Sequence, residues 1–434
     1  MNAPKRRLAA AGAALAAAAL TASALATTAE AKPSDKDDDL GRQTLKANDG
    51  WAAAEGGTTG GSDAAEENVH TVDNWAGLKE AVKGDEPKIV YVEGDIDAWT
   101  DADGNALSCE DFNDPEYSWD LYLETFDPEV WGWNEASGPV EEARDRSYDA
   151  FREHILLRIG SNTTIVGEGD ASVTHGSFYI GNADNVIVRN LGVHEAYDCF
   201  PQWEGDAWDA EFDNFEVTGS THVWLDHLTV TDGSTHDYEA PVIWDARLER
   251  LDGAIDIVRA SDLVTVSWSH IRNHDKTMLI GNTDSERYEE WDKLRVTVHH
   301  NWFENTGQRT PRTRYGQNHV YNNYISYDEA SGYPYFYSIG SGVHSDIYAE
   351  NNAFHLPSIA PEDTLRNWGG DRMHVEGTLF NGERVDLLAA YNEAYPEASM
   401  TDELEEYPEL HRNIHPTVAV PWLVRARAGA GELD

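Results

Sequence analysis

A short strand-forming unit repeats along most of the chain, beginning at about residue 160. Each copy has a few alternating β-forming residues, then a polar residue that is often asparagine, then an apolar residue. The equivalent positions are Asn190, His227, Ser269, Asn301, Asn323 and Asn352, which lie 37, 42, 32, 22 and 29 residues apart. The shortest step fits one turn of a solenoid, and the longer steps fit the same turn with inserted loops. Stacked parallel turns bury the faces that one turn leaves open, so the repeat predicts an all-β parallel β-helix.

The main alternative for a chain with many short strands is an antiparallel sandwich. That fold favours two-residue hairpin turns of Gly and Asn, which are scarce here. Apolar residues recur at helical spacing in 74–82 and 140–154, so we expect two peripheral helices, and a helix over the open end of the solenoid would cap it. Residues 99–138 are rich in Trp, Asp and Glu and are expected to form a long surface insertion. The recurring asparagines are expected to hydrogen-bond to one another along the axis.

The start of the chain predicts export. Lys5, Arg6 and Arg7 precede an Ala/Leu-rich run, and Ala29-Glu30-Ala31 matches a cleavage site for signal peptidase. The run is short and dominated by Ala, which argues against a transmembrane anchor. We therefore expect residues 1–31 to be a secretory signal peptide, residues 32–39 an acidic linker and residues 40–434 a single domain. The exported protein is expected to be extracellular and monomeric.

The net charge limits which partners the protein can bind, and the cysteine content bears on the compartment in which it works. The formal net charge is −47, and such a surface repels nucleic acids and anionic membranes, so neither is expected as a partner. The only two cysteines are Cys109 and Cys199. A pair of cysteines in an exported protein is more often a disulfide than two free thiols, so we expect them to be bridged.

Three aspartates lie within or close to predicted strands. Asp213 belongs to Glu-Phe-Asp-Asn, and Asp252 and Asp256 belong to Asp-Gly-Ala-Ile-Asp. Carboxylate oxygens are the ligands that Ca²⁺ prefers, and a solenoid brings distant residues onto neighbouring turns. In a chain this acidic, an aspartate is more often a solvated surface group. Spacing alone therefore leaves both interpretations open.

A cationic cluster follows the aspartates in the sequence. Lys276 lies in His-Asp-Lys-Thr-Met, and Arg309, Arg312 and Arg314 fall within six residues. In one interpretation they pair with carboxylates in a surface loop. In the other they bind an anionic substrate, because a guanidinium can hold a carboxylate through two parallel hydrogen bonds.

Four motifs in these regions resemble those of the pectate lyase family, polysaccharide lyase family 1. In chain order they are Val223-Trp-Leu-Asp-His227, Asp252-Gly-Ala-Ile-Asp256, the segment from His274-Asp-Lys276 to Gly281, and Arg309-Thr-Pro-Arg-Thr-Arg314. The resemblance runs over nearly the whole mature chain. It implies a right-handed, single-stranded parallel β-helix with long loop insertions and a few peripheral helices.

The resemblance also implies roles for single residues. Arg309 matches the general base of the family, and Lys276 and Arg314 match residues that hold the carboxylates of the substrate. Arg312 stands at a variable position of the motif and has no assigned role. The residues that match the calcium-binding positions are Asp213, Asp252 and Asp256.

The implied reaction is calcium-dependent β-elimination of (1→4)-α-D-galacturonan, the polygalacturonate of de-esterified pectin. It removes a proton next to a carboxylate and leaves a 4,5-unsaturated product. Ca²⁺, Lys276 and Arg314 would stabilise the enolate-like charge that this step creates. An acidic protein that acts on a polyanion needs such local positive charge or bridging cations.

Three other functions fit part of the pattern. A pectin lyase would act on methyl-esterified polymer without bound calcium and would be expected to lack the aspartates. A β-helix polygalacturonase would hydrolyse its substrate and would carry a Gly-His-Gly stretch, which the sequence lacks. A non-catalytic carbohydrate-binding β-solenoid would explain the repeats and the acidity, but it would not explain Lys276, Arg309 and Arg314 beside the aspartates.

Overall fold

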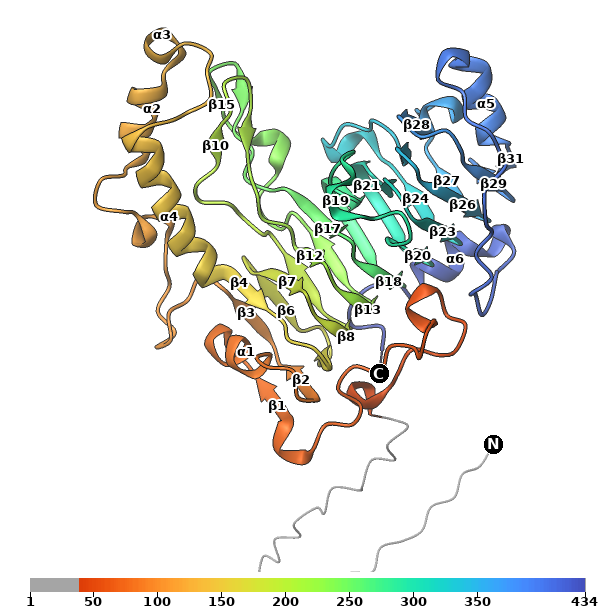
Figure 1. Ribbon diagram of the computed structural model, residues 1–434, viewed down its shortest axis with the longest axis horizontal. Helices are drawn as coiled ribbons and strands as arrows, with labels where there is room; N and C mark the ends of the chain where they lie inside the picture. The colour runs from red at the N-terminus through yellow and green to blue at the C-terminus, as the bar shows by residue number, and fades with distance from the viewer. Residues whose placement is uncertain (1–38, 434) are drawn as a thin grey trace, which may run out of the picture. The chain divides into compact units, whose positions relative to one another are not determined.

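Parallel strands stacked turn upon turn make up most of this computed structural model, which describes residues 39–433 (Figure 1). The predicted signal peptide, 1–31, and nearly all of the predicted linker, 32–39, lie outside the described residues. The described residues belong to one compact unit. The boundary between linker and domain stays a prediction.

One long sheet takes a single strand from each turn. Neighbouring strands pair in parallel throughout, as a solenoid requires. The ten strands, in spatial order, are β1 (Val69–Val72), β2 (Lys88–Val92), β5 (Thr163–Gly167), β8 (Asp184–Arg189), β13 (Thr221–Asp226), β18 (Asp262–Ser267), β20 (Val296–His299), β23 (Gln317–Tyr321), β26 (Asp346–Glu350) and β29 (His374–Glu376).

A second sheet, of 17 strands, contains two parallel rows that the long strand β19 (His270–Ile280) joins. The first half of β19 pairs with one row and the second half with the other. The row that includes the second half is called the site row below. Its other strands are β4 (Leu156–Arg158), β7 (Ser177–Gly181), β12 (Phe215–Thr218), β17 (Gly253–Val258), β22 (Arg312–Thr313), β25 (Ile339–Gly342) and β28 (Leu365–Trp368).

The second row completes each turn. It consists of β3 (Asp95–Asp97), β6 (Ser172–Thr174), β9 (Gly192–His194), β14 (Thr229–Thr231), the first half of β19, β21 (Trp302–Gln308), β24 (Tyr324–Ser326), β27 (Ala353–His355) and β30 (Leu379–Phe380), with β31 (Glu383–Arg384) antiparallel at its end. Two antiparallel hairpins, β10 (Gln202–Trp203) with β11 (Trp208–Asp209) and β15 (Val242–Ile243) with β16 (Ala246–Arg247), arise from inserted loops. The predicted fold class, a parallel β-helix, is confirmed.

The core runs along the inside of the turns. Val186, Val223, Val264 and Val296 are register partners in four successive turns, and all four are fully buried. Each turn on its own would leave its valine exposed on two sides. Stacking removes that apolar surface from water, which stabilises the folded state by about 25 cal/mol per Å². This burial favours the register that aligns the valines.

Two of the six positions predicted to be equivalent are wrong by one residue. The bends that follow strands of the ten-strand sheet show this. Six bend residues have left-handed backbone with φ between 50° and 56°: Asn190, His227, Trp268, His300, Asn322 and Asn351. By the strand register, Leu191 and Leu228 occupy the position equivalent to Ser269, whereas Asn190 and His227 occupy the position one residue earlier. The sequence pattern misses this because Asn suits both the left-handed position and the next one.

The predicted asparagine ladder is confirmed in three turns. The Asn301 side chain donates to Asn323 Oδ1 at 3.1 Å, and the Asn323 side chain donates to Asn352 Oδ1 at 3.1 Å. Asn323 also donates to the Val298 carbonyl at 2.9 Å and accepts from the Asn301 backbone N–H at 3.0 Å. All three side chains are buried, so the ladder satisfies backbone groups at a bend that no water reaches.

The predicted helices are confirmed to within a residue or two at each end. Helix α1 (Trp75–Ala81) is capped by the Asn74 side chain and packs against β1, β2 and β4, where it covers the first turns. Helix α4 (Pro139–Ile155) begins with proline at its first turn. Two further helices, α5 (Leu387–Ala394) and α6 (Val420–Arg425), lie near the C-terminus.

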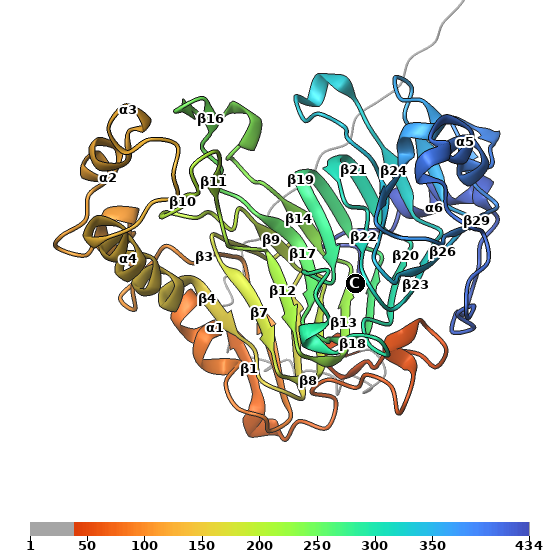
Figure 2. The same ribbon diagram turned by 45° about the horizontal axis from the view of Figure 1, so that its top comes forward.

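The predicted surface insertion is more than a surface loop. It forms α2 (Trp119–Phe126) and α3 (Pro128–Trp131), which stand beside α4 and the β10–β11 hairpin (Figure 2). Its aromatic side chains build a second core, separate from the one inside the turns, with Tyr122, Phe126, Trp203 and Trp208 buried in it. Of the tryptophans of the segment itself, Trp99, Trp119 and Trp131 are partly buried and pack against this core, and Trp133 is exposed.

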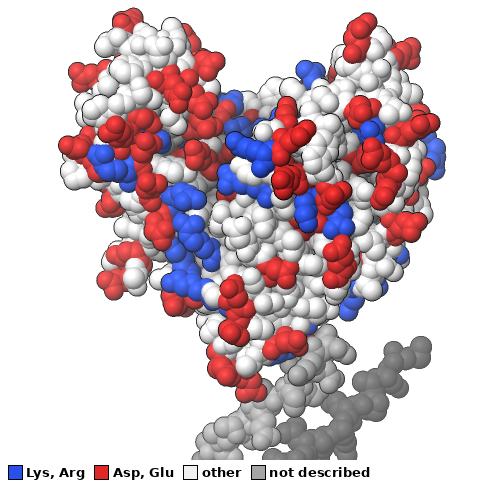
Figure 3. Space-filling view, in the orientation of Figure 1, with Lys and Arg blue, Asp and Glu red and all other residues white. Residues whose placement is uncertain are grey.

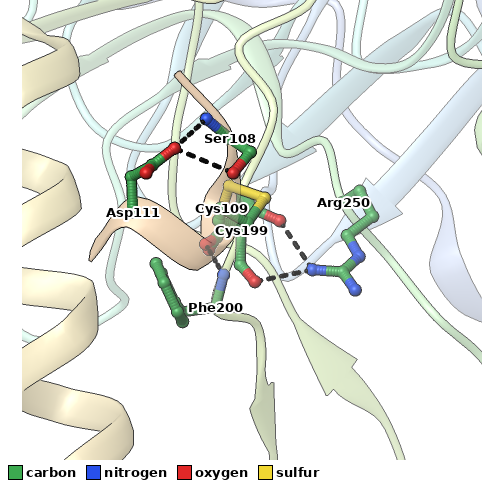
Figure 4. The surroundings of a disulfide bond; sticks show 7 residues. Ser108, Cys109, Asp111, Cys199, Phe200 and Arg250 are labelled. Atoms are coloured by element: carbon green, nitrogen blue, oxygen red, sulfur yellow. Dashed lines mark hydrogen bonds between the residues drawn. A yellow bond between two sulfur atoms is a disulfide. The ribbon is translucent and has the colours of Figure 1, made fainter. Parts of the chain in front are cut away.

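The predicted disulfide joins this insertion to the β-helix. Cys109 and Cys199 are bridged, with Cα atoms 5.4 Å apart and a sequence separation of 90. Figure 4 shows Arg250 beside the bridge. Its guanidinium donates to the carbonyls of Asp198 and Cys199 at 3.0 and 2.8 Å, which fixes the loop that carries Cys199.

Replacing Asn323 by alanine should destabilise the protein strongly. The change leaves the Asn301 N–H buried without its partner, and such a group costs about 1–3 kcal/mol. The free energy of unfolding in urea should fall by about 1–3 kcal/mol. Asn134→Ala is the matched control, since the Asn134 amide makes one exposed hydrogen bond, and it should change stability by less than about 0.5 kcal/mol. Equal stability of the two variants would contradict a structural role for the ladder.

Candidate functional site

The predicted site residues lie on adjacent strands of the site row. Here β12, β17 and β19 border a cleft of about 450 Å³, whose lining includes Asp213, Asp252 and Asp256. These aspartates come from two neighbouring turns, because β12 pairs with β17. The next strand, β19, carries Lys276 opposite Gly253. Residues that are up to 63 positions apart in sequence are therefore brought to one cleft by the register alone.

Two of the aspartates are buried side by side. Asp213 accepts a hydrogen bond from the Gly253 N–H at 2.8 Å, and Asp256 accepts one from the Leu279 N–H at 3.2 Å. Burial, and then the carboxylate of Asp252, raises the pKa of Asp256 to about 7. Burial, Asp256 and Asp252 raise the pKa of Asp213 well above its usual range. The cleft thus concentrates negative charge that a cation would relieve.

Gly253 creates the space between these two carboxylates. A Cβ atom at this position would lie 2.5 Å from Asp213 Oδ1 and 2.6 Å from Asp256 Oδ1. Real Cβ atoms do not come so close to their neighbours. The glycine of the Asp-Gly-Ala-Ile-Asp motif therefore lets both carboxylates face the same point above the backbone, which is the arrangement that an oxygen-ligated cation requires.

Lys276 holds the third aspartate. Its ammonium group lies 3.0 Å from Asp252 Oδ1 and 2.9 Å from Glu249 Oε2. Burial lowers the pKa of Lys276, but Asp252 and Glu249 more than offset it, so the pKa lies above its ordinary value. Lys276 is therefore a fixed positive charge at the edge of the carboxylate cluster.

Arg309 lies directly after β21 and has left-handed backbone with φ of 62°. Its carbonyl accepts a hydrogen bond from the Met278 N–H at 2.8 Å, which joins it to β19. Its guanidinium opposes the rise in the pKa of Asp256, so it faces the aspartate cluster. Within residues 39–433 no carboxylate lies within 4.0 Å of it, and its Nε atom is buried without a hydrogen-bond partner.

Arg314 lies beyond the end of β22 and is held differently. Its guanidinium pairs with Asp284 at 2.6 Å and donates to the Gly281 carbonyl at 2.8 Å. Asp284 is mostly exposed, so an anionic ligand can compete with it for Arg314. Of the six predicted site residues, Asp213, Asp252 and Asp256 line the cleft, Lys276 contacts Asp252, and Arg309 and Arg314 come from the next motif.

The charge pattern of this face resolves the conflict between an acidic protein and an anionic substrate. Figure 3 shows one group of Lys and Arg near β4 and a second group in the middle of the face, with Asp and Glu dense at the upper left and on the right. Arg152 and Arg259 line the cleft. The positive charge on this face is therefore local.

Several charged residues of the cleft carry no signal in the sequence. Asp209, on β11, lines it, and burial together with Asp252 raises the pKa of Asp209 to about 7. Glu249 pairs with Lys276, and Glu216 and Arg259 line the wall. None of them sits in a recognisable motif, because the turns that place them are set by long-range register.

The fit of a metal ion is partial in this conformation. Within the described residues, no three or more His, Cys, Asp or Glu side chains already surround one point at metal-binding geometry. Asp213 and Asp256 flank the open space above Gly253, whereas Asp252 is turned to Lys276. Hard oxygen donors and clustered negative charge suit Ca²⁺, and only Asp252 has to change partners to complete the set.

Fold and site together define a β-helix polysaccharide lyase. A sequence profile described as pectate lyase matches residues 13–112 and 141–373. The gap between the two matched segments, 113–140, contains α2 and α3. The profile therefore does not cover these two helices.

Known proteins agree with the profile. The chain is 40% identical over 407 residues to pectate lyase of Bacillus subtilis (strain 168), which covers 91% of this chain and 95% of that protein. It is 36% identical to pectate lyase D of Dickeya chrysanthemi, covering 80% and 81%. The solved thermostable pectate lyase PL 47 superposes with a TM-score of 0.88 at 40% identity, covering 91% of this chain and all of that one. The chain belongs to the pectate lyase family, and its activity is that of a pectate lyase.

Replacing Gly253 by alanine should disable the cleft. The added methyl group displaces Asp213, Asp256 or both, and overpacking of this kind costs about 1–3 kcal/mol. Cleavage of polygalacturonate should fall at least about tenfold. Gly77→Ala, in exposed helix α1, adds the same methyl group 3.2 Å from a flexible Asn74 side chain and should keep full activity. Full activity of Gly253→Ala at every calcium concentration would contradict the arrangement described.

Proposed function

We propose that this protein is an extracellular pectate lyase that cleaves polygalacturonate by calcium-dependent β-elimination in the cleft of the site row. The observation that carries the proposal is the pair of buried carboxylates, Asp213 and Asp256, that flank Gly253 with Lys276 and Arg309 on the following turns. Two solved relatives support it: one is a pectate lyase bound to a hexasaccharide, at 39% identity, and the other is a pectate lyase studied for its anti β-elimination mechanism, at 38% identity.

Asp213, Asp252 and Asp256 would hold the calcium. Bound there, Ca²⁺ supplies positive charge that neutralises a substrate carboxylate and makes the neighbouring C5 proton more acidic. Asp252 can leave Lys276 and turn to the metal, because Lys276 then keeps Glu249 as its counter-ion. The ion pair between Lys276 and Glu249 therefore preserves the position of the lysine.

Lys276 and Arg314 would hold substrate carboxylates. Lys276 has a long side chain anchored on β19, and its ammonium group stays charged because two carboxylates support it. Arg314 can exchange the exposed Asp284 for a uronate, because both present a carboxylate to the same donors. Fixed positive charge near the reacting carbon stabilises the enolate-like charge without the cost of reorienting water.

Arg309 would remove the C5 proton. A guanidinium accepts a proton only in its neutral form, and neighbouring cations favour that form. Arg309 has no carboxylate within 4.0 Å among the described residues, and Arg312 and Arg314 follow it in the same motif. After the proton leaves C5, the electron pair forms the C4–C5 double bond and the C4–O bond to the leaving sugar breaks. That oxygen takes a proton, which water can supply.

Export and a monomeric state belong to the same proposal. Residues 1–31 have the features of a secretory signal peptide, and the disulfide between Cys109 and Cys199 suits an oxidising environment. Across residues 39–433 no helix has the length and apolar character needed to cross a membrane. The net charge of −47 argues against nucleic acid or anionic lipid as a partner.

The type of reaction can be read from the product. β-Elimination leaves a double bond conjugated to the carboxylate, which absorbs ultraviolet light, whereas hydrolysis does not. Purified protein with polygalacturonate and calcium should give a rising ultraviolet signal that a chelator abolishes. Highly methylated pectin should give a weaker signal, because esterification removes the carboxylates. New reducing ends without absorbance would indicate hydrolysis, and full activity in excess chelator would refute the role of calcium.

Arg309→Lys tests the base directly. Lysine keeps the positive charge but moves it and removes the guanidinium, so kcat on polygalacturonate should fall by about 100–10,000-fold, the usual contribution of a general base. Arg272→Lys is the control, because Arg272 on β19 is exposed, has no ion pair among the described residues and lies in the first half of the strand. It should keep parental turnover. Turnover of Arg309→Lys within about threefold of the parent would remove Arg309 from this role.

A further inference from the structure

The site row continues past the cleft with a second pair of arginines. Arg312 on β22 is the register partner of Gly340 on β25, and Gly340 is the partner of Arg366 on β28. Two cations thus lie on alternate strands with a glycine between them. Neighbouring strands are about 4.8 Å apart, so Arg366 lies about 10 Å along the row from Arg312 in the direction away from the aspartates.

The indole of Trp368 organises these two arginines. It comes from the same strand as Arg366, and its ring centre lies 4.6 Å from the Arg312 guanidinium and 5.3 Å from that of Arg366. A Cβ atom at Gly340 would lie 3.1 Å from the Trp368 ring and 2.9 Å from the Tyr337 ring. The glycine therefore lets both rings lie over β25. Trp368 remains 38% exposed, so its edge is available to a ligand.

The polar groups here lack acceptors. Neither Arg312 nor Arg366 has a carboxylate within 4.0 Å in the part of the chain described, although the chain has 79 acidic residues against 32 basic ones. Arg312 Nε is buried and makes no hydrogen bond to the described residues. Burial and the neighbouring Arg314 lower the pKa of Arg312, as expected of a cation without its counter-ion.

The position connects this cluster to the reaction. Burial raises the pKa of Tyr337, and the adjacent Arg309, Arg312 and Trp368 oppose that rise. Arg312 is also the register partner of Leu279, which lines the cleft, and the centroids of the Tyr337 and Trp368 rings lie 6.0 Å apart. A polymer lying in the cleft and following the row reaches Arg312 first and then Arg366.

We propose that Arg312, Arg366 and Trp368 form an additional binding position for one uronate unit, outside the bond that is cleaved. The two guanidiniums, held beside the indole, donate to the uronate carboxylate, and the exposed edge of the indole packs against the sugar ring. This proposal rests on the proposed function only in taking polygalacturonate as the ligand. In this proposal Arg312, which the family motif leaves without a role, raises the affinity for longer substrates. It takes no part in the elimination reaction.

The test compares substrates of different length. Trp368→Ala and Arg366→Gln should raise KM for hexagalacturonate about tenfold, the loss expected for one charge-assisted contact with its packing, and raise it much less for trigalacturonate. Trp368→Phe should recover part of the affinity. Trp422→Ala is the matched control, since Trp422 is 68% exposed on α6, and it should match the parent on both substrates.

Calorimetric titration with hexagalacturonate separates the two proposals. It needs no turnover, so a tenfold higher Kd for Trp368→Ala and Arg366→Gln would support the binding position even if the product assay contradicts β-elimination. A purely structural role would lower thermal stability and affect both substrates equally, which would overturn the proposal. Unchanged Kd and KM in Arg366→Gln, which alters only an exposed side chain, would overturn it as well.

Discussion

The register between successive parallel turns is the constraint on which the rest of this structure depends. Buried valines align along the inside, left-handed bend residues turn the chain at the same place in six successive turns, and hydrogen bonds between Asn301, Asn323 and Asn352 join three of these bends. A slip by one residue would turn every side chain to the other face of its strand. It would place Lys276 away from Gly253 and separate the two turns that carry the aspartates. Stability and function therefore share one physical cause, and the core that holds the turns in register also holds the cleft.

Electrostatics explain how so acidic a chain can bind an anionic polymer. The buried carboxylates of Asp213 and Asp256 repel each other, and a bound cation would relieve that repulsion. The positive residues beside them follow two patterns: Lys276 and Arg314 have carboxylate partners that can be exchanged, whereas Arg309, Arg312 and Arg366 have none within the described residues. In the proposed function the first group exchanges a carboxylate of the protein for one of the substrate, Arg312 and Arg366 gain a counter-ion from the substrate, and Arg309 accepts the C5 proton. Acidic residues elsewhere on the surface then discourage the polymer from binding outside the row.

The sequence predicts much of this because several of its signals are local. The repeat predicts the β-helix, helical periodicity predicts α1 and α4, and the family motifs point to the residues that meet in the cleft. What it misses depends on long-range packing. The repeat alone misplaces Asn190 and His227 by one residue, since asparagine suits two successive positions of the bend. The aromatic core of the insertion, the ion pair of Lys276 with Glu249 and the proximity of Asp209 all arise between turns. The partner that Asp252 takes in this conformation, Lys276, is likewise set by the pairing of β17 with β19.

The central claim is that the register builds a calcium site from Asp213, Asp252 and Asp256. A crystal of the protein grown with calcium and hexagalacturonate, with the Arg309→Lys change to prevent turnover, tests it most directly through the anomalous signal of the metal. The account predicts a calcium peak above Gly253, bounded by the three carboxylates, with Asp252 released from Lys276 and Lys276 still paired with Glu249. A calcium peak away from these residues, or an unbroken pair between Asp252 and Lys276 beside bound substrate, would contradict it.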